Sequence, residues 1–242
     1  MGPVDRLTLS SSERHELPRE EQEFIDGCRA IVLGQDETAL LHLRKVLHLA
    51  DGAFLAGVVA LKMNRLAEAT EFLSSITERE CALDRHLSRA GISVAVRLPV
   101  SDEVSAEVNP DLQGVLLALS LAYLKQKRWR DARGQLQRLR RIQPYDTAAK
   151  LAMAEWHLRA RPGERQAFVE VIRLAEGIEG ESAIEAALLL DKTKALRGLG
   201  RIAEALTTLV ALQGRRKHYS EDFNEAVAQE RKALLATEEP SG

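Results

Sequence analysis

The stretch Leu116–Pro144, LLALSLAYLKQKRWRDARGQLQRLRRIQP, decides the fold class of this chain. Its first half places Ser120 and Tyr123 among leucines at helical spacing, and its second half does the same with Ala132 and further leucines. Pro144 then ends the second pattern. Two short amphipathic helices cannot bury their apolar faces by themselves, so this stretch predicts further copies of the same pair elsewhere in the chain.

The pattern recurs as a small residue followed twelve positions later by an alanine. Small residues at these points allow the two helices of a pair to approach closely. The pairs are Gly27 with Ala39, Gly57 with Ala69, Ser120 with Ala132, and Thr193 with Ala205, while Ala154 and Ala167 are separated by one extra residue. Apolar residues follow four and seven positions after each alanine: Leu43, Val46, Leu73, Ile76, Leu136, Leu139, Val171, Leu174, Leu209 and Leu212.

These spacings resemble those of the tetratricopeptide repeat (TPR) family, most closely in Leu116–Pro144, and together they cover most of Glu21 to Leu212. The resemblance implies an all-α fold, a right-handed α-α superhelix of the TPR solenoid type. It also implies a concave groove that holds a peptide or helix of a partner protein, and no catalytic residue. A hairpin followed by a repeat is similar to a loosely defined group of bacterial TPR proteins with no assigned activity.

The expected organisation is one solenoid over residues 21–236 between a flexible arm, 1–20, and a flexible tail, 237–242. Within it we expect two repeats in 21–77, an atypical helix plus hairpin in 78–109, three repeats in 110–214 and a capping helix in 215–236. The capping helix would place Phe223, Val227, Ala228 and Leu235 on one face. Asp36 and Asp51 are expected to cap the helices that follow them.

The segment between the second and third helix pairs departs from the repeat. A helix is expected from Glu78 to about Ala90. Apolar residues then alternate with other residues from Ile92 to Leu98 and again from Val104 to Val108, which is the period of a strand. We therefore expect a β-hairpin, with a helical alternative for the first of these two segments.

The TPR resemblance assigns certain first-helix positions to the concave face. The floor would be apolar and its edge basic, which suits an amphipathic helix or an extended peptide with acidic residues. The alternative is that neighbouring helices or the C-terminal segment cover the floor. The groove residues so implied are Leu117, Leu121, Leu124, Lys125, Leu151, Glu155, Leu158, Arg159, Leu190, Lys194 and Arg197.

Charge gives weak grounds for other partners. The 242 residues carry a formal net charge of −2, so the chain has no overall field that would attract nucleic acid or anionic membranes. The run Lys125–Arg141 is strongly basic, but most of it falls on a second helix, whose outer face is ordinarily just solvated. Nucleic-acid or anionic-surface binding is thus an unfavoured alternative. A second alternative is self-assembly into a homo-oligomer through the hairpin edge or a solenoid end.

Motifs for catalysis or cofactor binding do not stand out. No glycine-rich phosphate loop is present, and His42 and His48, six residues apart, do not share a helical face. We therefore expect no enzyme activity, no cofactor and no metal site. Cys28 and Cys81 suit buried reduced thiols. The N-terminus lacks a signal-like apolar core and no apolar run is long enough to span a membrane, so a cytoplasmic location is expected.

Overall fold

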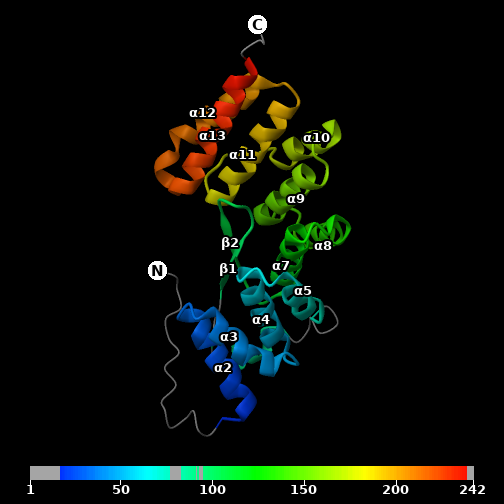
Figure 1. Cartoon of the computed structure of the whole chain (residues 1–242), viewed down its shortest axis with the longest axis vertical. Coiled ribbons are helices and arrows are strands. Elements are labelled where there is room, and N and C mark those ends of the chain that lie inside the picture. Colours follow the sequence, from blue (N-terminus) through cyan, green and yellow to red (C-terminus); the bar gives the residue numbers. More distant parts are fainter. Residues whose placement is uncertain (1–16, 77–82, 91, 93–94, 239–242) are drawn as a thin grey trace. The chain divides into compact units, whose positions relative to one another are not determined.

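The computed structural model describes residues 17–76, 83–90, 92 and 95–238 (Figure 1). These residues form mainly helices, together with one two-stranded sheet. The expected fold class, an all-α array of helix pairs with a short β-hairpin insertion, is therefore confirmed. Internal contacts divide the chain into two compact units: Met1–Leu98 with Glu107–Arg128 (unit 1), and Pro99–Ala106 with Trp129–Gly242 (unit 2).

In unit 1, each helix from α2 to α5 packs against the next one, and α6 contacts α4. α2 packs on α3, α4 on α5, and α7 on both α4 and α5. Turns of only a few residues join the members of a pair, which makes them antiparallel neighbours. The helices are α2 (Arg19–Val32), α3 (Asp36–Leu43), α4 (Ala50–Lys62), α5 (Leu66–Ser74), α6 (Arg85–Arg89) and α7 (Leu112–Lys125), with the 3₁₀ turn η1 (Arg44–Val46) after α3.

Unit 2 repeats this plan. α9 packs on α10 and α11 on α12, while the two first helices, α9 and α11, also touch each other directly. The last helix, α13, packs on both α11 and α12. The elements are α8 (Trp129–Ile142), α9 (Thr147–Ala160), α10 (Arg165–Leu174), α11 (Ala183–Gly198), α12 (Ile202–Gly214), the 3₁₀ turn η3 (Arg216–His218) and α13 (Glu221–Glu238).

Glycines on the first helices stand where the paired helix comes closest. A Cβ atom added at Gly57 would lie 2.5 Å from Cγ of Leu73 on α5, and one added at Gly27 would lie 2.8 Å from the side chain of Leu43 on α3. Real Cβ atoms do not approach other atoms so closely, so any larger residue forces the leucine opposite, or its helix, to shift. The steric reason for the small residues is therefore confirmed in these two pairs.

The remaining positions of the repeat pattern are buried as expected. All five anchor alanines and all ten apolar residues that follow them have almost no exposed surface. Ser120, Ala154 and Thr193, the small residues of the later pairs, are also fully buried. The phase of the repeat, read from sequence spacing, is thus correct in every copy.

The insertion contains the expected hairpin. Strand β1 (Val96–Pro99) pairs with β2 (Ser105–Val108). Val96 and Leu98 on β1 are buried while Arg97 between them is exposed, which is the alternation that predicted a strand. The helical alternative is wrong over Val96–Pro99; Ser93 and Val94 lie outside the described residues.

Two other expected boundaries lie partly outside the described residues. Of the helix expected from Glu78 to Ala90, residues 78–82 are not described, and the described part is the short helix α6. Asp84 just before it has φ of 60°, a left-handed conformation that a continuous helix cannot include. The arm expected over residues 1–20 is described only from Leu17, and helix α2 already begins at Arg19.

Asp51 does not cap the helix that follows it, and neither does Asp36. Asp51 is the second residue of α4 and is fully buried. Its Oδ1 accepts a hydrogen bond from the backbone N–H of Asp84 (2.5 Å), and its Oδ2 accepts from those of His86 (2.7 Å) and Leu87 (3.2 Å). Asp51 therefore caps α6, more than thirty residues away, because the first N–H groups of a helix lack partners of their own.

The face of α13 also differs from the sequence-based interpretation. Phe223, Val227 and Leu234 are buried, but Ala228 and Leu235 are exposed. The expectation was wrong for the last two, because the buried stripe advances by three or four residues and passes through Glu230 instead. A charged residue occupies a buried position here because it has a partner on α11, described below.

Asp51→Ala should destabilise the protein by on the order of 2–4 kcal/mol, since it leaves three backbone N–H groups without an acceptor in the interior. The measurement is the free energy of unfolding in urea. Asp36→Asn is the matched control: Asp36 forms a surface pair with Lys62 (2.8 Å), so its replacement should cost under about 1 kcal/mol. Equal effects of the two substitutions would show that Asp51 does not hold α6.

Candidate functional site

Most of the leucines expected to form the groove floor are buried by the chain itself. Leu117, Leu121 and Leu124 on α7 are buried within unit 1. In unit 2, Leu151 and Leu190 are buried, and Leu158 near the end of α9 is half-buried. Of the six leucines, therefore, Leu158 offers the most apolar surface to a partner.

The basic residues expected at the groove edge in unit 2 are already paired with carboxylates. Nε of Arg159 lies 2.5 Å from Oε2 of Glu155, one turn earlier on α9. Nζ of Lys194 lies 2.9 Å from Oδ1 of Asp191 on α11. In unit 1, the remaining basic residue, Lys125, is exposed. The basic edge in unit 2 is thus largely neutralised within the chain.

Arg197 on α11 forms the third such pair, with Glu230 on α13. Its Nε lies 2.7 Å from Oε1 of Glu230, and its Nη2 lies 3.1 Å from Oε2. This two-point geometry suits the planar guanidinium and fixes α13 against α11. It also explains why Glu230 occupies a buried position on α13.

The pairs on α9 and α11 belong to one group of charges, which also includes the turn between β1 and β2. Asp102 in that turn lies 3.2 Å from Nη2 of Arg159. Glu103 is close enough to affect the titration of Glu155, Asp191 and Lys194. We call this group the charge cluster; its members are Asp102, Glu103, Glu155, Arg159, Asp191 and Lys194.

Burial makes ionisation of the carboxylates in the charge cluster unfavourable. Glu155 is 6% exposed, and burial together with the nearby Asp191 raises the pKa of Glu155 to about 7, although Arg159 and Lys194 act in the opposite direction. Burial likewise raises the pKa of Asp191, which is 2% exposed. Although burial alone would lower it, the pKa of Lys194 is raised, because Asp191 and Glu155 stabilise its charge. The cluster therefore holds a proton that is easily lost near neutral pH.

Sequence reasoning found half of the charge cluster. Glu155, Arg159 and Lys194 were among the implied groove residues, but Asp191, Glu103 and Asp102 were not. Asp191 carries a detectable signal, since it is a carboxylate directly after the apolar run Ala186–Leu190 and three residues before a lysine, a spacing that lets the two side chains meet. Glu103 and Asp102 carry none, because the hairpin turn reaches α9 only through tertiary structure.

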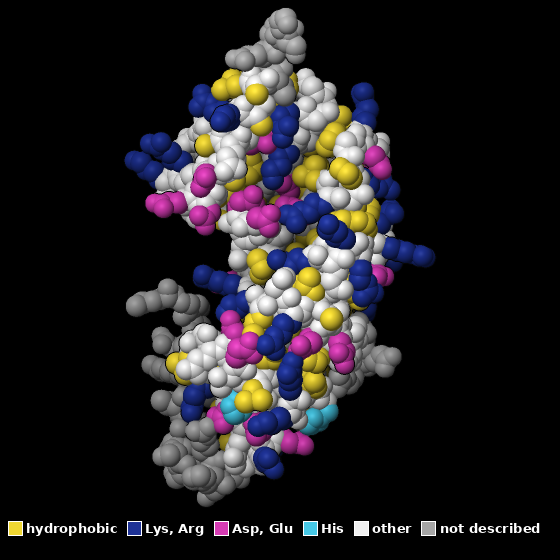
Figure 2. All heavy atoms as spheres, viewed as in Figure 1, with side chains coloured by type: hydrophobic (Ala, Val, Ile, Leu, Met, Phe, Trp, Pro, Cys, Tyr) yellow, Lys and Arg dark blue, Asp and Glu magenta, His cyan; other side chains and the backbone are white. Residues whose placement is uncertain are grey.

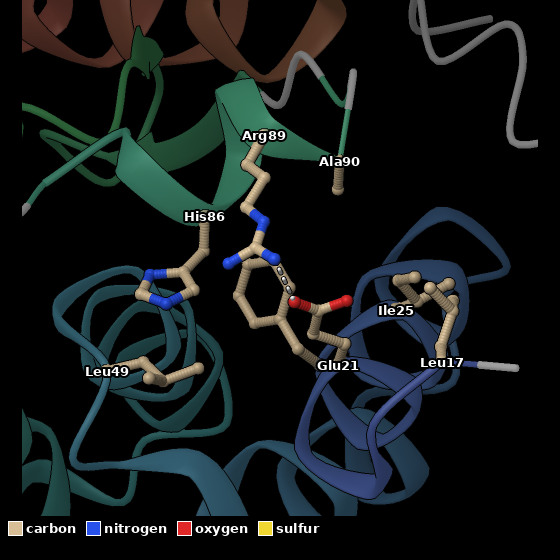
Figure 3. Close-up of a pocket in the computed structure, with 8 residues that line it drawn as sticks. Leu17, Glu21, Ile25, Leu49, His86, Arg89 and Ala90 are labelled. Carbon is tan, nitrogen blue, oxygen red and sulfur yellow. Dashed lines mark ion pairs between the residues drawn. The ribbon is translucent and has the colours of Figure 1, made fainter.

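Unit 1 contains a separate pocket between α2, the start of α4 and α6 (Figure 3). Its volume is about 320 Å³ and most of its wall is apolar. Glu21 and Arg89 form an ion pair of 3.4 Å at its polar side, and the rings of Phe24 and His86 meet edge to face with centroids 6.3 Å apart. Such a pocket has room for one small apolar group. The lining residues are Leu17, Glu21, Phe24, Ile25, Leu49, His86, Arg89 and Ala90.

The basic run Lys125–Arg141 does not form a free row of charges. Arg128 stacks on the ring of Tyr123 within unit 1, at 4.5 Å from its centroid. Arg133 in unit 2 lies over the ring of Trp156, at 5.4 Å. Figure 2 shows Lys and Arg side chains spread along the visible face with acidic side chains interspersed among them. The run thus takes part in packing as well as facing solvent.

Other chemistry has little support in the described part of the chain. No group of three or more His, Cys, Asp and Glu side chains there could hold a metal ion. None of the helices among those residues has the length and apolar character needed to cross a membrane. Cys28 is buried, as expected, and burial raises the pKa of its thiol to about 12, so it stays protonated. Cys81 lies outside the described residues.

No protein-family model and no curated protein matches the chain, but solved structures do. A thermophilic TPR protein from Thermus thermophilus is 17% identical, with a TM-score of 0.48, over 89% of this chain and 99% of that one. A tetratricopeptide repeat protein from Parabacteroides merdae is 12% identical, with a TM-score of 0.40, over 93% and 95%. The architecture is of tetratricopeptide type. That assignment follows from the chain's own helix pairs, with their buried anchor alanines and close glycine contacts.

The raised pKa of Glu155 predicts a pH-dependent stability. The folded protein binds this proton more tightly than the unfolded chain, whose glutamate has a pKa of 4.5, so stability is lost as the pH rises from about 4.5 through about 7. Glu155→Gln keeps the neutral form, so the variant should gain on the order of 1–3 kcal/mol relative to wild type between pH 5 and pH 8. Urea unfolding at several pH values measures this difference.

Glu176→Gln, at an exposed position of the same unit, is the control and should shift stability equally at every pH. If the difference in the free energy of unfolding between wild type and Glu155→Gln does not change with pH, the raised pKa of Glu155 is contradicted.

Proposed function

We propose that the protein is a non-enzymatic adaptor or scaffold that binds another protein on the first-helix face of α9 and α11. One observation carries the proposal: these adjacent first helices hold buried charged residues, Glu155 and Asp191, at or beside positions that face the concave side in TPR repeats. Packing of one repeat on the next requires apolar residues and gains nothing from a buried carboxylate. Charges kept in such places are typical of recognition sites.

The accessible part of this face defines what a partner can touch. Leu158 supplies apolar surface, and the side chains of Arg159 and Lys194 are partly exposed. A partner would place an apolar side chain against Leu158 and polar groups against the charge cluster, which is the usual division between anchor and rim in protein interfaces. The cytoplasmic location, the bacterial origin and the alternatives of self-assembly and nucleic-acid binding stay predictions.

Leu158→Glu should abolish capture of the partner, because it places a charge where the partner buries an apolar group. The measurement compares the proteins retained by immobilised wild type and variant from the native cell extract, after circular dichroism has shown that both are folded. The expected loss of the specific partner is at least about tenfold, equivalent to about 1.4 kcal/mol.

Val169→Glu is the matched control, since Val169 lies on α10, the second helix of the same pair, and is 41% exposed. It should capture the partner as well as wild type does. If Leu158→Glu and Val169→Glu retain the same proteins as wild type, the binding face is elsewhere and the proposal fails.

A further inference from the structure

We propose that the charge cluster is a recognition site for a cationic side chain, the guanidinium of an arginine or the ammonium of a lysine, in a segment of the partner protein. The inference rests on the proposed function and deepens it by naming the chemistry of the partner. It reverses the expectation from sequence, in which a basic groove edge suggested an acidic partner.

The first argument is the balance of charge. The cluster contains four carboxylates, those of Asp102, Glu103, Glu155 and Asp191, but only two cations. Arg159 is shared between Glu155 and Asp102, and Lys194 pairs with Asp191. With every group ionised, the cluster carries a net charge of −2; the carboxylates of Glu155 and Asp191 are buried, whereas that of Asp102 is 81% exposed. One added cation would reduce that excess in the region where electrostatic interactions are strongest.

The second argument is an acceptor without a donor. Oδ2 of Asp191 is buried and has no hydrogen-bond partner, although Oδ1 of the same carboxylate is bonded to Lys194. Buried polar atoms in native proteins nearly always have partners, so a lone carboxylate oxygen among charged residues points to a group that arrives later. An ammonium or guanidinium group supplies both the N–H donor and the missing positive charge.

The third argument is access. The side chains of Arg159 and Lys194, which pair with the buried carboxylates of Glu155 and Asp191, are 43% and 32% exposed. Both are long and rotate about several single bonds, so they can turn outward into water without disturbing α9 or α11. Leu158 lies next to Arg159 and offers an apolar surface for the methylene groups of an incoming lysine or arginine.

An organic cation fits the cluster better than a divalent metal ion. Among the described residues no three side chains are placed to hold a metal, and the two resident cations would repel a double charge. A single cation instead favours the ionised form of Glu155, whose pKa is raised to about 7 by burial and by Asp191. Binding should therefore release a proton, as the groups that act on Glu155 (Asp191, Arg159, Lys194 and Glu103) and Asp102, which pairs with Arg159, readjust.

The test is selection of random displayed peptides on immobilised wild-type protein, followed by calorimetric titration of the selected peptides. The selected peptides should share an arginine or lysine at one position. Replacing that residue with norleucine should weaken binding to wild type at least about tenfold, but to Asp191→Asn less than about twofold. Glu176→Gln is the matched control and should behave as wild type.

A second calorimetric measurement detects the proton released on binding. Peptides are titrated into wild type at pH 7 in two buffers of different ionisation enthalpy, and proton release should be seen only with peptides that carry the basic residue.

The outcomes separate the inference from the function on which it rests. Selected peptides that lack a shared basic residue, or a norleucine effect of the same size in wild type and Asp191→Asn, overturn the cationic site and leave the adaptor proposal standing. Failure to select any peptide overturns both. In a third outcome, no peptide is selected, but the small amine agmatine raises the melting temperature of wild type and not that of Asp191→Asn. That result would overturn a partner protein as the source of the cation and assign the site to a small amine.

Discussion

The close approach of the two helices in the pairs α2–α3 and α4–α5 is the constraint on which the rest of unit 1 depends. At Gly27 and Gly57 the neighbouring helix leaves no room even for a methyl group. This contact limits the rotation of each helix about its own axis, because a larger residue at the contact would overlap the leucine opposite it. Once the rotation is limited, the positions that can face the next pair are limited too, and they hold the buried leucines.

Helix packing likewise explains how charged residues come to lie inside unit 2. On α11, the side that packs against α9 and the neighbouring elements includes Asp191 as well as leucines, and on α9 it includes Glu155. Rotating either helix to bring its carboxylate to solvent would also move the fully buried Ala154 or Thr193 and the buried leucines beside them. The chain stabilises the two carboxylates with Lys194 and Arg159, while burial raises the pKa of both carboxyl groups, which is a costly arrangement for a purely structural array.

The sequence predicts well whatever depends on local spacing. The anchor alanines, such as Ala69, and the apolar positions after them are buried because helical periodicity and steric size determine them directly. It predicts poorly what depends on residues far apart in the chain. Asp51 looks like a cap for its own helix but bonds to α6, and the charge cluster brings Glu103 from the hairpin turn to α9 and α11. On α13, the partner that makes Glu230 tolerable is Arg197, which no local pattern reveals.

A double-mutant cycle between Gly57 and Leu73 tests the central constraint most directly. Gly57→Ala should destabilise the protein, although alanine is the better helix former, because its methyl group would lie 2.5 Å from Cγ of Leu73. In the background of Leu73→Ala, which removes that atom, the same substitution should become neutral or stabilising, with a coupling of at least about 1 kcal/mol. Additive effects, or a Gly57→Ala protein as stable as wild type, would show that the helices are not in close contact at this position.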